Sequence, residues 1–120
     1  MILVTGGTGF VGGHLVDRLV QEKVQSRGLV RKGSNIEKLK KENALIDVSF
    51  GDLTDGDSLK KALKGVDTVV HLIGIIVEKK GATFEIIHSK GTRNLVYTVF
   101  NKIVLTAMEQ NILNISVVCQ

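Results

Sequence analysis

A short apolar run that leads directly into closely spaced glycines constrains this chain more than any other feature. Residues 2–5 read Ile-Leu-Val-Thr, which is typical of a buried strand. Apolar residues then recur three and four positions apart over residues 10–22, which predicts an amphipathic helix. Gly6, Gly7 and Gly9 lie between the two, and Gly12 lies in the first turn of the predicted helix.

The glycine spacing predicts a tight turn that brings the backbone close to a phosphate. Gly7-x-Gly9-x-x-Gly12 matches the dinucleotide fingerprint, and the triplet that starts at Gly6 matches a related spacing. The free N–H groups and the dipole of the following helix would face the anion. We therefore expect the turn to bind a pyrophosphate, with a glycine-rich turn that binds nothing as the alternative. The candidate residues are Gly6, Gly7, Thr8, Gly9, Phe10, Val11 and Gly12.

The rest of the chain alternates predicted strands and helices, which indicates an α/β fold. Strands are expected at 2–5, 24–30, 44–50, 66–73 and 112–119. Helices are expected at 10–22, from Ser34 or Asn35 to 41, from Thr54 or Asp55 to Gly65, and over 84–99. This order predicts a doubly wound parallel sheet, a Rossmann domain that occupies residues 1–120.

Further candidate ligand residues follow the predicted strands, whose carboxyl ends meet at one edge of the sheet. Arg31 follows the second strand where a carboxylate would bind a ribose, and an arginine there suits a 2′-phosphate. NADP is therefore favoured over NAD, unless Arg31 is an ordinary loop cation. Asp52 is a candidate acceptor for the adenine amino group, and Leu53 would pack on the ring. Ile73 and Gly74 would let the backbone approach the cofactor.

Composition and charge argue against several other classes of function. The net charge is +4, but the lysines are scattered and no aromatic residues lie between them, so nucleic acid is not an expected partner. Cys119 is the single cysteine, which favours a reducing compartment and hence the cytoplasm. No apolar run is long enough to span a bilayer, and the three histidines show no metal-ligand spacing. His71 is expected to be a core histidine whose ring nitrogens are hydrogen-bonded.

Four segments together resemble the extended and atypical short-chain dehydrogenases/reductases, including NAD-dependent epimerase/dehydratase-like proteins. They are residues 5–12, 29–31, 51–55 and 65–72. Residues 71–76 and 88–94 look most like the branch of the nucleotide-binding accessory subunit of respiratory complex I. The resemblance covers about residues 1–100. It implies NAD(P) binding, with the glycine turn at Gly6, Gly9 and Gly12, the phosphate clamp at Arg31, and adenine contacts at Asp52 and Leu53.

The chain departs from the catalytic pattern of that family. Catalytic members use a Tyr-x-x-x-Lys pair, but Asn101 stands four residues after Tyr97, and Lys102 stands five residues after it. We therefore assign no catalytic residue and predict that Tyr97 is a partly buried packing residue. Ser116 lies in the last predicted strand without a defined register, and it is not assigned a role.

The chain is expected to be the nucleotide-binding part of an oxidoreductase or epimerase/dehydratase, without its substrate-binding part. The alternative is a non-catalytic nucleotide-binding module that assembles, or senses redox state in, a respiratory or quinone-related complex. The last twenty residues, 101–120, fit the family poorly. An open edge of the sheet would favour a homodimer.

Overall fold

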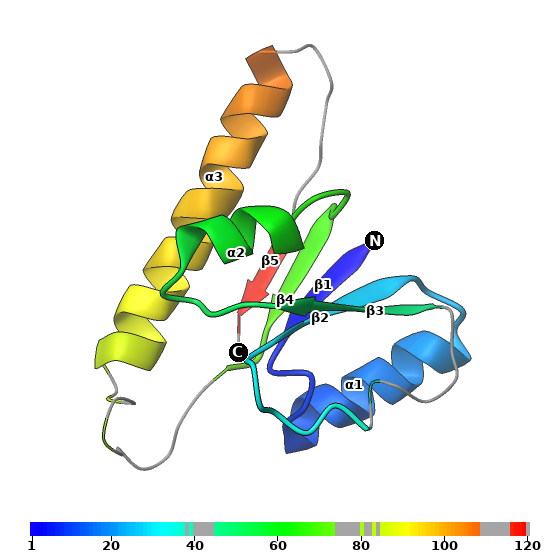
Figure 1. Ribbon diagram of the computed structural model, residues 1–120. Helices are drawn as coiled ribbons and strands as arrows, with labels where there is room; N and C mark the ends of the chain where they lie inside the picture. Colours follow the sequence, from blue (N-terminus) through cyan, green and yellow to red (C-terminus); the bar gives the residue numbers. More distant parts are fainter. Residues whose placement is uncertain are drawn as a thin grey trace.

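The computed structural model describes residues 1–37, 39, 45–73, 80, 83, 85–108 and 116–119. For residues 87, 88, 102–108 and 116–119 it describes the backbone only. The strands are β1 (Ile2–Thr5), β2 (Ser26–Val30), β3 (Ile46–Phe50), β4 (Thr68–His71) and β5 (Ser116–Cys119). The helices are α1 (Phe10–Gln21), α2 (Gly56–Ala62), the π-helix η1 (Glu85–Gly91) and α3 (Thr92–Met108) (Figure 1).

The strands form one parallel sheet in the order β3-β2-β1-β4-β5. Helix α1 covers one face of this sheet, and α2 and α3 cover the other (Figure 1). This arrangement confirms the predicted doubly wound α/β fold. β1 pairs with β2 on one side and with β4 on the other, so the strand order reverses at β1. The connections to the two halves of the sheet diverge at this point.

Alternate residues of β1 enter two separate apolar clusters, one on each face. Leu3 and Val4 are both fully buried. Leu3 packs in the cluster shared with α2 and α3, whereas Val4 packs in the cluster shared with α1. A strand covered on both faces needs apolar residues at every position, which is why the first strand is a continuous apolar run.

Arg27 is a charged residue within β2 that forms hydrogen bonds to two neighbouring elements. Its Nε donates to the carboxylate of Asp47 on β3 at 2.7 Å. Its Nη1 donates to the carbonyl oxygens of Ala62 and Lys64, each at 2.7 Å. The guanidinium therefore caps the end of α2 and holds that helix against the sheet.

The prediction of a helix beginning at Ser34 or Asn35 is wrong for the described residues. The Ser34 N–H donates to the Arg31 carbonyl at 3.1 Å, and Gly33 has φ +82°. These features define a β-turn with glycine at the position that requires positive φ. Asn35 Oδ1 then accepts the Glu37 N–H at 2.9 Å, which caps a turn and not a helix. Residues 38 and 40–44 lie outside the described part of the chain.

Several boundaries also differ from the predictions. β4 covers residues 68–71 of the expected 66–73, because Gly65 (φ +75°) and the Val66 N–H bond to Leu63 form a turn before it. α3 extends to Met108, since no glycine or proline interrupts it. The expected partial burial of Tyr97 is wrong: its side chain is 65% exposed, because Leu95 and Val99 face the core instead.

Candidate nucleotide-binding site

The glycine turn between β1 and α1 closes on itself so tightly that Gly6 and Gly12 have no room for a side chain. Gly6 has φ +80°, and the Gly9 N–H donates to the Gly6 carbonyl at 3.0 Å. A Cβ at Gly12 would lie 2.0 Å from that same carbonyl oxygen. The backbone path therefore requires glycine at Gly6 for its conformation and at Gly12 for space. Because these two positions carry no side chain, a phosphate can approach the backbone more closely here than at a turn with side chains at both positions.

Helix α1 starts at this turn with its N–H groups available for an anion. Gly9 is the N-cap residue, and the Gly13 N–H makes the first helical bond, to the Gly9 carbonyl at 2.9 Å. The N–H groups of Phe10, Val11 and Gly12 precede that bond, so they have no partner within the helix. No acidic residue lies in the first turn. The arrangement has the polarity that a pyrophosphate requires.

The turn lies at the point where the sheet order reverses, between the carboxyl ends of β1 and β4. A Cβ at Gly6 would lie 2.9 Å from the carbonyl carbon and oxygen of Leu72, which follows β4. The Leu72 N–H donates to the Thr5 carbonyl at 3.0 Å. Ligands of open α/β sheets bind at such switch points. Ile73 is partly buried beside the core at this place, and Gly74 lies outside the described residues.

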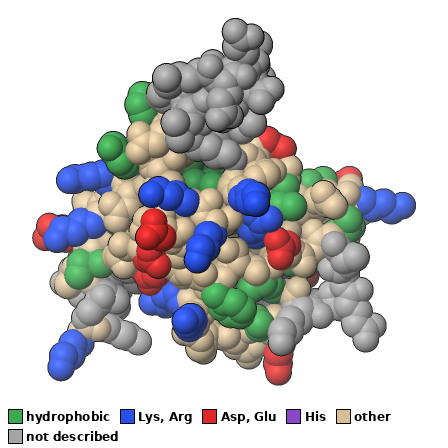
Figure 2. Space-filling view, turned by 45° about the horizontal axis from the view of Figure 1, so that its top comes forward, with side chains coloured by type: hydrophobic (Ala, Val, Ile, Leu, Met, Phe, Trp, Pro, Cys, Tyr) green, Lys and Arg blue, Asp and Glu red, His purple; other side chains and the backbone are tan. Residues whose placement is uncertain are grey.

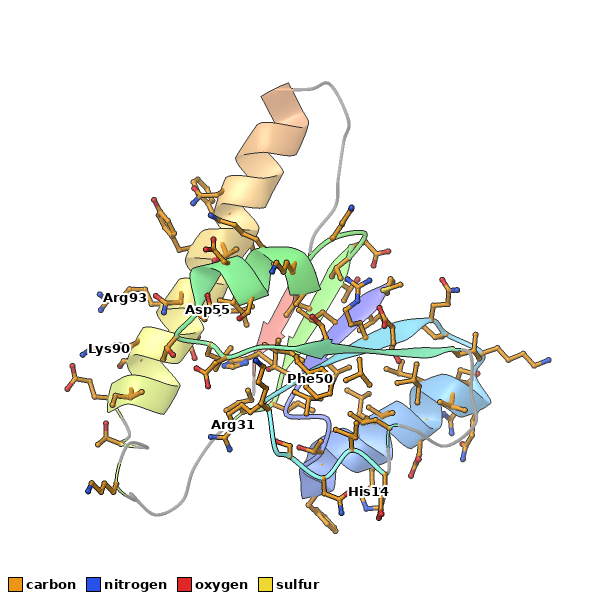
Figure 3. The ribbon with its side chains drawn as sticks, viewed as in Figure 1. His14, Arg31, Phe50, Asp55, Lys90 and Arg93 are labelled. Atoms are coloured by element: carbon orange, nitrogen blue, oxygen red, sulfur yellow. The ribbon has the colours of Figure 1, made fainter. Side chains whose placement is uncertain are left out.

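Arg31 projects from the β-turn that follows β2, at the same edge of the sheet (Figure 3). Arg31 and its neighbour Lys32 are both exposed. The structure thus brings a cation to the site, close enough for its charge to act on Asp52.

Asp52 begins the loop between β3 and α2. Partial burial opposes ionisation of its carboxyl group, but two hydrogen bonds and the charge of Arg31 outweigh it and lower the pKa of Asp52. The bonds come from the Thr54 N–H at 2.8 Å and the Thr54 hydroxyl at 2.7 Å, both to Oδ1. Asp52 is therefore held as a carboxylate at neutral pH. The side chain of Leu53 is 5% exposed and packs within the core, so it offers little surface to a ligand.

The structure confirms the prediction that the ring of His71 is hydrogen-bonded in the core. The residue is 4% exposed. Its Nδ1 lies 2.6 Å from the Thr5 hydroxyl, and its Nε2 lies 3.0 Å from the Thr92 hydroxyl. The ring therefore joins the end of β1, just before the glycine turn, to the start of α3.

Two polar residues beside the site were missed by sequence reasoning. The Ser58 hydroxyl accepts the Asp52 N–H at 3.1 Å. The Asn94 side-chain amide donates to the Leu53 carbonyl at 3.0 Å. Neither contact leaves a local signal, since the partners lie 6 and 41 residues away.

Basic side chains alternate with acidic and apolar ones on the face shown in Figure 2, as expected of a solvated surface. Among the described residues, no group of three His, Cys, Asp or Glu side chains could hold a metal ion. The helices in that part of the chain include none with the length and apolar character needed to cross a bilayer.

The fold and the turn agree with a comparison to known families. Residues 2–113 match the NAD dependent epimerase/dehydratase family. The chain belongs to this family. It is 34% identical over 104 residues to a 3-beta-hydroxysteroid dehydrogenase from Mycolicibacterium neoaurum, a match that covers 80% of the chain and 27% of that relative. It is 39% identical over 83 residues to eugenol synthase 2 from Clarkia breweri, covering 62% of the chain and 26% of the relative.

Solved structures show the same relationship. The structure of gox2253 superposes with a TM-score of 0.72 at 34% identity, and the match covers 84% of this chain and 31% of that one. UDP-glucose 4-epimerase from Thermus thermophilus, a complex with NAD, gives a TM-score of 0.66 at 25% identity, covering 81% and 32%. The chain thus spans about a quarter to a third of the length of these relatives. None of these matches supports the branch of the respiratory complex I subunit.

Proposed function

We propose that residues 1–120 form the dinucleotide-binding domain of an NAD(P)-dependent oxidoreductase, and that this domain prefers NADPH. The glycine turn would hold the pyrophosphate, Arg31 the 2′-phosphate, and Asp52 the adenine amino group. The observation that most supports this proposal is the close approach of Gly12 to the Gly6 carbonyl, which leaves no room at Gly12 for a side chain larger than hydrogen. Such a turn at a sheet switch point suits close approach of a phosphate.

The preference for NADPH is supported by the β-turn after β2. A ribose 2′-hydroxyl is usually bound by a carboxylate at this place, but the turn carries the cations Arg31 and Lys32. An exposed guanidinium can donate two hydrogen bonds to a phosphate in one plane. NAD is the less favoured cofactor, although one structural relative is a complex with it.

We propose that polar groups recognise the adenine ring of the dinucleotide. Asp52 offers a carboxylate, fixed by Thr54, that can accept a hydrogen bond from the amino group. Because Leu53 is buried, little of its side chain can contact the adenine ring. Asp52 therefore contributes more to adenine recognition than the sequence suggested.

The whole protein is proposed to transfer a hydride to or from a carbonyl or hydroxyl group, chemistry that the bound nicotinamide supplies. The relatives named above include a dehydrogenase and an epimerase, and this supports an enzyme of the same broad type. The chain itself holds and orients the cofactor. Tyr97 has no role in the proposal, because it lies exposed on α3, before β5.

Two further proposals follow from the sequence and the sheet. The single cysteine suits a reducing compartment, and we place the protein in the cytoplasm. β3 and β5 form the two edges of the described sheet, so a homodimer through one edge is proposed. Elution as a monomer in size-exclusion chromatography at high concentration would contradict the dimer. The non-catalytic respiratory module is not carried further, because no relative named above supports it.

Calorimetric titration with NADPH and with NADH tests the proposed function. Wild-type chain is expected to bind NADPH more tightly. Arg31→Ala should weaken NADPH binding about tenfold to a hundredfold, the loss expected for a charge-assisted hydrogen bond, and leave NADH binding unchanged. Arg18→Ala is the matched control, because Arg18 is an exposed arginine at the far end of α1. Equal losses in both variants, or no binding of either nucleotide by the wild type, would contradict the proposal.

A further inference from the structure

The loop that carries Asp52 is anchored from outside by the first turn of α3. The Asp52 N–H is held by Ser58 of α2, and its carboxylate is held by Thr54 of the loop itself. In the described part of the chain, the anchor that comes from a distant element is the bond from Asn94 to the Leu53 carbonyl, at 3.0 Å. This bond fixes the loop one residue from Asp52.

Gly91 supplies a second constraint on the same loop. A Cβ at Gly91 would lie 2.9 Å from Leu53 Cδ1 and 3.1 Å from Leu53 Cβ. The absence of a side chain at Gly91 thus makes the notch in which Leu53 is buried. Leu53 is held on its backbone by Asn94 and on its side chain by Gly91.

We propose that Asn94 and Gly91 are positioning residues for adenine recognition, because together they fix the loop from which Asp52 would read the adenine amino group. This inference rests on the proposed function. A hydrogen bond loses its strength when donor and acceptor move apart by a fraction of an ångström or lose their alignment. A loop released at Leu53 would therefore bind the nucleotide but discriminate less between bases.

The test compares NADPH with its purine analogue, in which a hydrogen replaces the adenine amino group and the ring nitrogens are unchanged. The measured quantity is the ratio of the two dissociation constants from calorimetric titration. Wild-type chain should prefer NADPH about tenfold, since the carboxylate accepts a hydrogen bond from the amino group and the analogue offers none. Asn94→Ala should lower this preference about fivefold, through a larger loss of affinity for NADPH than for the analogue.

Thr98→Val is the matched control on the same helix. The Thr98 hydroxyl donates to the Asn94 carbonyl at 2.7 Å, so its loss perturbs α3 but not the Asn94 amide. The control should keep the wild-type preference. Should Asn94→Ala fail to fold, Gly91→Ala gives the same comparison, because its new methyl group pushes on Leu53.

The outcomes separate the inference from the proposed function. A wild-type preference that survives in Asn94→Ala and Gly91→Ala overturns the inference alone. Equal binding of NADPH and the analogue by the wild type overturns adenine reading by Asp52, and the inference with it. A loss of preference in Thr98→Val equal to that in Asn94→Ala would show a general effect of α3 and also overturn the inference.

Discussion

Replacement of His71 by leucine should destabilise the fold far more than replacement of a surface histidine. His71 and Thr5 are 4% and 0% exposed, and their side chains meet at 2.6 Å. Leucine cannot form this bond or the bond to Thr92. Each lost bond costs about 1 kcal/mol, and an unpaired buried hydroxyl at Thr5 costs about 1–3 kcal/mol. Leucine restores some apolar burial, so the expected net loss is about 2–3 kcal/mol.

Urea unfolding followed by circular dichroism measures this loss, with His14→Leu as the control. His14 is exposed on α1, and its replacement should change the free energy of unfolding by less than about 0.5 kcal/mol. A double-mutant cycle with Thr5→Val isolates the pair. The double variant leaves neither partner unpaired, so it should lose at least about 1 kcal/mol less than the two single losses summed. Additive losses, or a His71→Leu variant as stable as wild type, would show that the bond between His71 and Thr5 does not stabilise the fold.

Three other expectations follow from the described contacts. Arg27→Lys should lower the free energy of unfolding in urea by about 1–2 kcal/mol, because lysine cannot donate at once to Asp47 and to the α2 carbonyls. The control Arg18→Lys should change this free energy little. Equal losses in the two variants would contradict the capping role of Arg27. Folding lowers the Asp52 pKa, so its carboxylate stabilises the fold above the unfolded pKa of about 4, and this contribution is lost as pH falls through the lower, folded pKa. In urea unfolding, the stability gap between wild type and Asp52→Asn should be constant above about pH 5 and should shrink as pH falls below about 4; a gap that stays constant at low pH would count against this expectation. Gly12→Ala should weaken NADPH binding at least about a hundredfold in calorimetry, because its Cβ would lie 2.0 Å from the Gly6 carbonyl oxygen. The control Gly56→Ala has open space around its new methyl group and should bind NADPH as the wild type does.

The elements that could be predicted from the sequence are those whose cause is local. The glycine turn needs only neighbouring residues to define it, and its predicted position after a strand and before a helix is confirmed. The alternation of apolar strands and amphipathic helices specified a two-sided parallel sheet. The helix expected after Ser34 is replaced, in the described residues, by a turn in which the Leu39 N–H donates to the Ile36 carbonyl, three residues earlier. Apolar periodicity alone does not distinguish such a turn from a helix.

The parts of the site that were missed depend on contacts between distant residues. Asn94 meets Leu53, and Arg27 meets the end of α2, only once the sheet has formed. Tyr97 was assigned the wrong environment because α3 carries apolar residues on more than one side, and packing against α2 selects Leu95 and Val99. Tyr97 stands two residues from both Leu95 and Val99, which places it on another side of the helix from them.

Binding of the dinucleotide at the glycine turn is tested most directly by an amide proton–nitrogen correlation spectrum of the ¹⁵N-labelled chain, recorded with increasing NADPH. We expect the largest changes at the backbone N–H groups of Phe10, Val11 and Gly12, with further changes in the turn at Arg31 and the loop at Asp52. These groups lie at one edge of the sheet and would share one ligand. A spectrum that NADPH leaves unchanged, or changes confined to residues away from the glycine turn, would contradict the claim that this turn binds the dinucleotide.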